Sequence, residues 1–145
     1  MGKTMSDKEI RSSIDWDSYF FKIMESTSLR SKDPNTKVGA VIVNENKQIV
    51  GLGYNGFPAG FKDTESRWQR PTKYNYVVHA EVNAMLNSHH SLKGCSIYLP
   101  FWPCKDCCKY IAASGITKVN VLSEYYKSDI AEEIFDECGI QVETH

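Results

Sequence analysis

Five residues in two short segments carry the chemistry that this sequence can perform. His79 and Glu81 occur in the first segment, and Pro103, Cys104 and Cys107 occur in the second. One imidazole and two thiolates suit Zn²⁺, and three protein ligands leave the fourth tetrahedral position for water. On a helix, Cys104 and Cys107 lie on one face and can hold one ion together. The sequence therefore predicts an open zinc site made by His79, Cys104 and Cys107.

Each segment is expected at the start of a helix, and this position suits both cysteines. The unpaired N–H groups and the positive dipole end of a helix start favour thiolate over thiol. Glu81 lies two residues beyond His79 and so off the face that His79 presents. Because two thiolates already neutralise Zn²⁺, the ion acidifies its water less than a three-histidine site would, and a nearby carboxylate is needed to take the proton. We therefore interpret Glu81 as a proton carrier and not as a ligand.

A closed structural zinc site is the alternative interpretation. It needs a fourth protein ligand, which Cys108 or Cys95 could supply. However, the pattern H-x-E followed by P-C-x-x-C is the signature of zinc deaminases that act on nucleobases. A structural site has no use for a proton carrier, so the pattern favours an open, catalytic site.

The elements that position these residues alternate along most of the chain. Hydrophobic periodicity and turn residues predict helices over 16–29, 78–88, 105–114 and 128–138, and strands over 38–43, 48–54, 95–99, 117–122 and 140–142. Residues 55–73 are rich in glycine, proline and charge and are predicted to form a loop. A helical crossover allows a parallel return, so we expect the last strand to lie parallel to the fourth. The predicted fold class is α/β, with a five-stranded mixed sheet and helices on both faces.

Composition limits the class of protein. The chain has 145 residues, of which 41% are hydrophobic and 24% are charged, and its net charge is −1. We expect a flexible segment over 1–14 and a single domain over 15–145. Near-neutral charge argues against a nucleic-acid partner. No apolar stretch reaches the roughly 20 residues of a membrane helix, so no membrane partner is expected.

Cysteine usage and the first residues bear on location. The five cysteines include an adjacent pair, which is a poor disulfide framework, and the sequence starts without a secretory signal. Both features predict a reducing, cytoplasmic compartment. Gly2 matches a myristoylation pattern, but a single acyl chain holds a membrane only marginally.

Several longer segments resemble the deoxycytidylate (dCMP) deaminase family within the cytidine deaminase-like superfamily. They are S-K-D-P-N at 31–35, V-G-A-V-I-V at 38–43, G-Y-N-G-F-P at 53–58, H-A-E-V-N-A at 79–84 and P-C-K-D-C-C-K at 103–109. The resemblance implies a three-layer fold, one catalytic Zn²⁺ per chain, and hydrolysis of dCMP to dUMP and ammonia, which supplies thymidylate synthesis. It also implies a homo-oligomer, often a hexamer, and in many members activation by dCTP and inhibition by dTTP.

The resemblance implies roles for single residues as well. Glu81 would move the proton to ring N3 and then to the leaving ammonia, the backbone N–H of Ala80 would hold the base carbonyl, and Asn55 would contact the sugar. Asn55 could also serve simply as a turn residue beside Gly56. A phosphate needs cationic or N–H donors. Arg30 is the candidate that the resemblance offers, and a solvated charge is the alternative.

Two further predictions concern loops. Tyr126 follows the fourth strand, at the edge where α/β sheets bind ligands, so it is either a substrate contact or an exposed loop tyrosine. An aromatic ring and three cations near the end of the 55–73 loop could bind a nucleotide triphosphate effector between subunits, or be solvated: Trp68, Arg67, Arg70 and Lys73. Asn75 stands where many family members have proline, which bears on the effector response.

Three functions compete for these residues. The leading hypothesis is deamination of dCMP. A second is another zinc deaminase, acting on free cytidine or deoxycytidine or on tRNA adenosine. The helix expected before the last strand argues against the nucleoside enzymes, and the absence of a basic excess argues against the tRNA enzymes. A zinc-stabilised binding module without turnover is the third hypothesis, and the presence of Glu81 argues against it.

Overall fold

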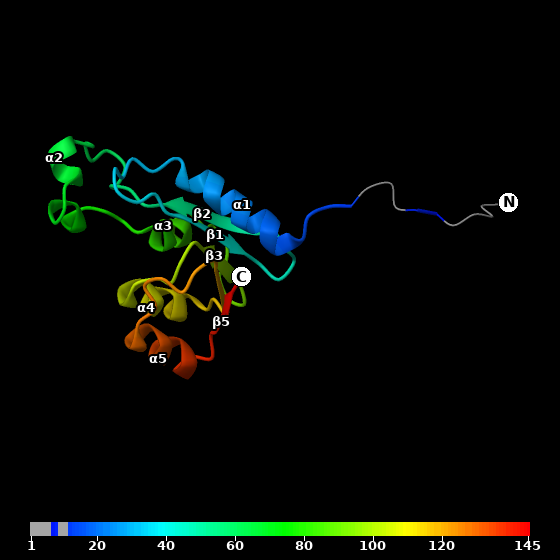
Figure 1. Ribbon diagram of the computed structural model, residues 1–145. Coiled ribbons are helices and arrows are strands. Elements are labelled where there is room, and N and C mark those ends of the chain that lie inside the picture. Colours follow the sequence, from blue (N-terminus) through cyan, green and yellow to red (C-terminus); the bar gives the residue numbers. More distant parts are fainter. Residues whose placement is uncertain (1–6, 9–11) are drawn as a thin grey trace.

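The computed structural model describes residues 7–8 and 12–145 (Figure 1). Gly2, where myristoylation was considered, lies outside the described residues, as does most of the predicted flexible segment 1–14. The elements are, in chain order, α1 (Trp16–Ser28), β1 (Gly39–Val43), β2 (Ile49–Tyr54), α2 (Glu65–Trp68), η1 (Thr72–Asn75), α3 (Ala80–Leu86), β3 (Ser96–Leu99), α4 (Lys105–Ser114), β4 (Lys118–Val121), α5 (Asp129–Glu137) and β5 (Gln141–Thr144). Among the described residues, no helix is both long and apolar enough to span a membrane.

The five strands form one mixed sheet in the order β2-β1-β3-β4-β5. Strand β1 pairs antiparallel with β2 and with β3, whereas β3, β4 and β5 are parallel to one another. Helix α5 supplies the crossover between β4 and β5. The predicted mixed sheet and the parallel last strand are both confirmed.

Helices cover both faces of the sheet (Figure 1). Strand β1 is buried along its whole length, and its side chains alternate between two cores. Ala40 and Ile42 belong to the larger core with residues of α3, α4 and α5, whereas Val41 and Val43 pack with residues of α1. The alternation follows from the two-residue period of a strand. The three-layer arrangement is therefore built from a sheet with no solvent-exposed face at its centre.

Close packing of α3 on β2 fixes the start of that helix. A Cβ added to Gly53 would lie 2.2 Å from the backbone nitrogen of Ala84 and 2.5 Å from the backbone oxygen of Ala80. Only glycine permits this approach. The Asn83 side chain donates a hydrogen bond of 2.8 Å to the Tyr54 carbonyl and ties the helix to the strand end.

The segment predicted as an irregular loop contains two short helices. Helix α2 starts at the N-cap Thr64, whose side chain accepts a hydrogen bond from the Arg67 N–H, and the 3₁₀ helix η1 follows it. Trp68 at the end of α2 is buried, and its ring stacks on Phe57 with centroids 4.0 Å apart. Helices of one turn give no repeating hydrophobic pattern, which is why the prediction from periodicity missed them.

Candidate active site

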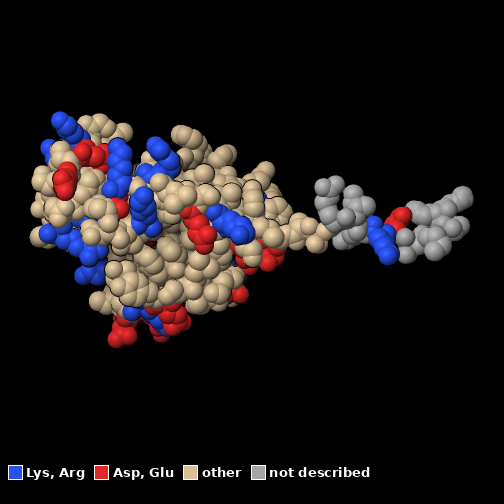
Figure 2. All heavy atoms as spheres, turned by 45° about the horizontal axis from the view of Figure 1, so that its top comes forward, with Lys and Arg blue, Asp and Glu red and all other residues tan. Residues whose placement is uncertain are grey.

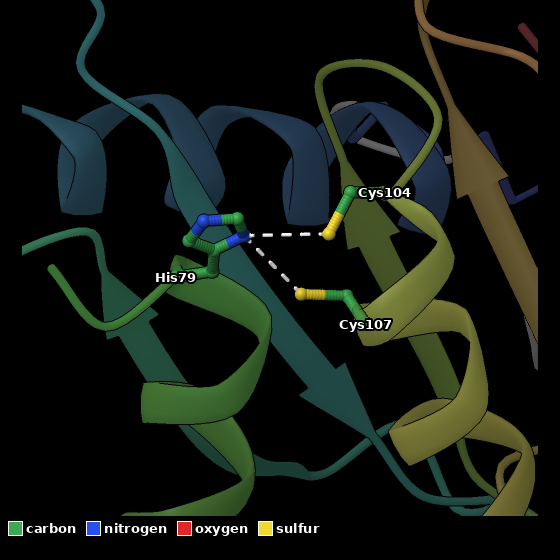
Figure 3. Close-up of side chains that lie close together, drawn as sticks. All are labelled: His79, Cys104 and Cys107. Atoms are coloured by element: carbon green, nitrogen blue, oxygen red, sulfur yellow. Dashed lines mark hydrogen bonds between the residues drawn. The ribbon is translucent and has the colours of Figure 1, made fainter. Parts of the chain in front are cut away.

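The two segments singled out for their chemistry meet at the starts of α3 and α4 (Figure 3). His79 is the N-cap of α3, Cys104 is the N-cap of α4, and Cys107 lies in the first turn of α4. The Nδ1 atom of His79 is 3.6 Å from the Sγ of Cys104 and 3.4 Å from the Sγ of Cys107. The three ligand atoms all lie within 4.8 Å of one another. The structure thus brings the predicted ligands together.

These distances fit a single tetrahedral ion. Zn–N bonds of about 2.0–2.1 Å and Zn–S bonds of about 2.3 Å separate nitrogen from sulfur by about 3.6 Å at the tetrahedral angle. Within the described part of the chain, the ligand group comprises His79, Cys104 and Cys107 only. The Cys108 thiol instead donates a hydrogen bond to the Pro103 carbonyl at 3.5 Å. The geometry supports an open zinc site over a closed one.

The environment of the two thiols favours a thiolate at Cys104. The Cys107 thiol donates a hydrogen bond to the Cys104 sulfur, and His79 adds a second, so the pKa of Cys104 falls to about 4 despite partial burial. The pKa of Cys107 is raised by that same hydrogen bond and by burial. The pKa of His79 is raised, chiefly by its hydrogen bond with Cys104. The sulfur of Cys104 is therefore the more easily deprotonated of the two.

Glu81 and Ala80 lie in the first turn of α3, beside the ligand group. The Glu81 side chain is buried, and burial raises the pKa of its carboxyl because the charged form is disfavoured. A carboxyl with a raised pKa can hold and release a proton near the pH at which an enzyme works. The backbone N–H of Ala80 is at the first position of the helix and has no intrahelical partner.

A cavity of about 310 Å³ opens beside the ligand group. This volume lies at the lower end of the range of small-molecule sites, about 300–1,000 Å³. Its wall contains residues predicted from the sequence to act on a metal, a base, a sugar or a phosphate: His79, Cys104, Glu81, Ala80, Asn55 and Tyr126.

The residues predicted as phosphate or effector contacts differ in whether they line the cavity. Arg70, predicted as an effector contact, lines the cavity, and so does Lys73. Arg30 follows α1 and does not contribute to the cavity wall. Trp68 is buried against Phe57, and its indole N–H donates to a carboxylate oxygen of Asp63 at 2.9 Å.

Tyr126 occupies a strained position at the cavity wall. Its φ of +67° lies in the left-handed region, which is uncommon for residues other than glycine. The ring contacts Phe101 and Tyr125, with centroids 5.2 Å and 4.2 Å away. Tyr126 is exposed and lines the cavity, so its phenol is available either to a ligand or to solvent.

Two lining residues were not predicted as part of the site. Asp33 and Lys73 form a buried ion pair with Nζ and Oδ2 2.8 Å apart. Asp33 lies in the S-K-D-P-N segment used for the resemblance, but no role followed from it, and Lys73 was grouped with solvated or effector-binding cations. An aspartate before proline is most simply a turn residue, so only the buried partner distinguishes this one.

Charge is unevenly distributed over the surface. Figure 2 shows lysine and arginine side chains concentrated at the end of the molecule that carries α2, and acidic side chains near α5. The acidic group on α5 consists of Asp129, Glu132, Glu133, Asp136 and Glu137. Arg70 follows α2 in the chain and lines the cavity, where a guanidinium favours an anionic ligand.

An α/β fold with an open His/Cys/Cys group at two helix starts, next to a buried glutamate and a ligand-sized cavity, defines the class of zinc-dependent deaminases. Residues 14–123 match the family described as the cytidine and deoxycytidylate deaminase zinc-binding region. The chain belongs to this family and is a deaminase. The fold predicted from the resemblance is confirmed.

Named relatives agree with this assignment. The deoxycytidylate deaminases of Pongo abelii and Homo sapiens are 43% and 42% identical over 138 residues, which is 88% of this chain and 78% of each relative. The crystal structure of the dCMP deaminase from the cyanophage S-TIM5, in complex with dCMP and dUMP, has a TM-score of 0.77 and is 31% identical. That match covers 93% of this chain and 100% of the phage chain.

Proposed function

We propose that this chain hydrolyses dCMP to dUMP and ammonia. One observation carries the proposal: a single cavity joins His79, Cys104 and Glu81 to the guanidinium-bearing Arg70. Hydrolytic removal of an amino group needs the metal ligands and the carboxyl of Glu81. Recognition of a phosphate needs a cation, which Arg70 supplies. The relative from S-TIM5 is a dCMP deaminase in complex with dCMP and dUMP, which supports the same substrate.

A zinc ion held by His79, Cys104 and Cys107, one per chain, would supply a Lewis acid that lowers the pKa of a water molecule. The proton movements belong to Glu81. Its carboxylate accepts one proton of the attacking water and passes it to ring N3. It then moves the second proton to the 4-amino group, which leaves as ammonia while carbon 4 keeps the oxygen.

The rest of the cavity orients the nucleotide. The free N–H of Ala80 donates to the 2-carbonyl of the base, next to the metal ligands. Arg70 and Tyr126 line the same cavity and can donate to the 5′-phosphate. Arg30, which the resemblance offers for the phosphate, is the competing candidate, so the two arginines need to be compared by substitution.

Side-by-side assays of cytosine absorbance with dCMP, CMP, deoxycytidine and dCTP test the substrate. We expect the highest kcat/KM with dCMP. A preference for deoxycytidine would contradict the phosphate contact. Zinc-loaded protein that turns over none of the four would contradict the proposal and favour tRNA adenosine as substrate or a binding module without turnover.

Regulation, assembly and location are proposed from the family resemblance and cysteine usage. Activation by dCTP and inhibition by dTTP, at a site that includes Trp68 and Arg70, are tested by adding each triphosphate to a dCMP assay. Assembly into a homo-oligomer, with a hexamer favoured, is tested by light scattering. The supply of dUMP for thymidylate synthesis and a cytoplasmic location complete the proposal.

A further inference from the structure

A buried polar network forms the part of the cavity wall that the proton chemistry does not use. It consists of Asp33, Asn55 and Lys73, which expose only 3%, 7% and 4% of their surfaces, and all three line the cavity. They come from three segments that are far apart in the sequence. Burial of two charged groups and an amide needs an explanation, because each costs free energy unless it is fully hydrogen-bonded.

The Asn55 carboxamide has almost no hydrogen-bonding capacity left. Its Nδ2 donates to the Thr36 carbonyl at 2.9 Å and to the Asp33 carboxylate at 3.2 Å. Its Oδ1 accepts from the Val38 N–H at 2.8 Å. An amide has two N–H donors and room for two bonds at the oxygen. The one position that remains is an acceptor position on Oδ1.

Asp33 sets this orientation of the amide together with the Thr36 carbonyl and the Val38 N–H. One of its oxygens accepts from the N–H groups of Asn35 and Thr36 at 2.8 Å and 3.2 Å, and the other accepts from Asn55 and from the Lys73 ammonium at 2.8 Å. Burial raises the pKa of Asp33, but the Lys73 and backbone hydrogen bonds outweigh it and the pKa is lowered. An ionised carboxylate can only accept, so the NH₂ of Asn55 must face it.

Lys73 supplies the charge that keeps Asp33 ionised. It lies in η1, and its carbonyl accepts from the N–H groups of Tyr76 and Val77 at 3.0 Å and 2.8 Å, which anchors it. Among the described residues, Asp33 is the acidic group in ion-pair contact with Lys73. Without this ammonium, the buried carboxylate would favour a proton. A protonated Asp33 could donate, and the Asn55 amide would then be held only by its bonds to Thr36 and Val38.

The network is tied directly to the metal ligands. Gly56, next to Asn55, and Val78, next to His79, exchange two backbone hydrogen bonds of 3.1 Å and 2.8 Å. Asn55 and His79 line the same cavity, so the free acceptor position on Asn55 is available to a ligand that lies there. Of the donors of dCMP, the 4-amino group is the reacting group and must face the metal ligands. The donor that remains is the 3′-hydroxyl of the sugar.

We propose that Lys73 and Asp33 are positioning residues, whose ion pair fixes the Asn55 carboxamide with its oxygen toward the substrate, where it accepts a hydrogen bond from the 3′-hydroxyl. The inference rests on the proposed function and assigns to Asp33 and Lys73 the task of holding the Asn55 amide that contacts the sugar. Lys73 and Asp33 act through Asn55 and do not touch the substrate.

The test compares dCMP with 2′,3′-dideoxy-CMP in wild-type protein and in Lys73→Met. Loss of one hydrogen bond should lower the wild-type kcat/KM about tenfold for the dideoxy compound. In Lys73→Met, the kcat/KM for dCMP should fall by about the same factor and the ratio between the substrates should approach one. Lys32→Met is the matched control, because Lys32 forms an exposed pair with Asp63 at 3.4 Å and should keep the wild-type ratio.

A second variant covers the case in which Lys73→Met does not fold. The double variant Asp33→Asn, Lys73→Met leaves no unpaired buried charge. Asn at position 33 would keep its oxygen toward the backbone N–H groups and set an NH₂ group against that of Asn55. The substrate ratio should again approach one, in protein whose zinc content and thermal midpoint show that it is folded.

Three results would overturn the inference. Equal losses for both substrates, with the tenfold ratio kept, would mean that the pair is only structural. A loss in Lys73→Met that disappears when deoxycytidine replaces dCMP would mean that Lys73 contacts the phosphate directly. Wild-type protein that does not deaminate dCMP would overturn the proposed function, and this inference with it. The first two results leave the proposed function standing, because the wild-type protein still deaminates dCMP.

Discussion

The two walls of the cavity are built in opposite ways. The metal-facing wall comprises His79, Glu81 and Cys104, all at the N-cap or in the first turn of two helices, with Cys107 buried behind them in the first turn of α4. The other wall, which we propose faces the sugar and call the sugar-facing wall, comprises Asp33, Asn55 and Lys73, which come from three segments without a common element. The first wall is held by local helix geometry, and the second by long-range hydrogen bonds between buried groups.

The difference separates reaction from recognition. Ligands on helix starts keep their spacing as long as two helices pack on the sheet, so the chemistry depends on few contacts. The sugar-facing wall depends on long-range hydrogen bonds between buried groups. Loss of a single partner leaves a buried polar group unsatisfied. We therefore expect substitutions in the first wall to abolish turnover and substitutions elsewhere to change which substrate is preferred.

Replacement of Cys107 by serine should have the largest effect. It removes a metal ligand, so zinc content and activity should fall to background, and the thermal midpoint should fall because the bound ion links the starts of α3 and α4. Metal analysis and calorimetry measure both effects. Cys108→Ser is the matched control, since that buried thiol donates to the Pro103 carbonyl and is not part of the ligand group among the described residues, so its loss should leave the zinc content unchanged. Full zinc content in Cys107→Ser would contradict the ligand assignment.

Glu81→Gln should keep the metal and lose the proton transfer. We expect kcat to fall by about 10²–10⁴, the usual contribution of a positioned acid or base. The KM for dCMP should change little. Steady-state kinetics together with metal analysis separate this variant from a ligand variant. Substantial turnover by zinc-loaded Glu81→Gln would remove Glu81 from the mechanism.

Arg70→Ala should affect binding of the phosphate. Loss of a charge-assisted hydrogen bond costs about 1.5–3 kcal/mol, so kcat/KM for dCMP should fall by about 10–100-fold. The activity on deoxycytidine, which has no phosphate, should not change. Arg30→Ala, measured in parallel, should behave as the wild type with both substrates. The reverse outcome would assign the phosphate to Arg30.

The smallest expected effect is a pH dependence of stability at the sugar-facing wall. The pKa of Asp33 lies below its ordinary value of 3.8 in the folded chain. The contribution of ionised Asp33 to the free energy of unfolding is therefore complete above about pH 4. It is lost as the pH falls through the lowered pKa. In Lys73→Met, burial should instead raise this pKa, so acid should stabilise the variant relative to its state at neutral pH.

The stability difference between wild type and Lys73→Met should thus be largest near pH 7. It should shrink toward pH 3, because the wild type loses the contribution of ionised Asp33 while the variant gains from its protonation. Urea unfolding across this range measures it. A pH-independent difference would show that the ionisation of Asp33 is not linked to Lys73.

The sequence predicted the metal-facing wall because its geometry is encoded locally. Cys104 and Cys107 are neighbours on any helix, and His79 with Glu81 marks a second helix start. The parallel pairing of β4 and β5 followed from the length of the α5 crossover, with no need of tertiary information. The structure agrees with these predictions because short-range rules determine both features.

The sugar-facing wall could not be predicted in the same way. Asp33 and Lys73 are 40 residues apart, and nothing in the sequence distinguishes a paired lysine from a solvated one. Arg70 lies between the two short helices α2 and η1, Lys73 lies in η1, and both residues line the cavity. Helices of one turn give no periodic signal in the sequence. Long-range pairing depends on the path of the whole chain, which only the folded structure supplies.

Because β3 and β4 are parallel, the loops that follow them lie side by side at the entrance of the cavity. The chain leaves both strands at the same edge of the sheet, so the segment before Cys104 and the loop with Tyr126 are neighbours, joined by a bond of 3.0 Å from the Trp102 N–H to the Tyr125 carbonyl. Exchange of the loop after β4 would reshape the entrance while the ion-binding helix starts stay in place. We therefore expect that replacing these loops one at a time can change which amine-bearing heterocycle enters the cavity.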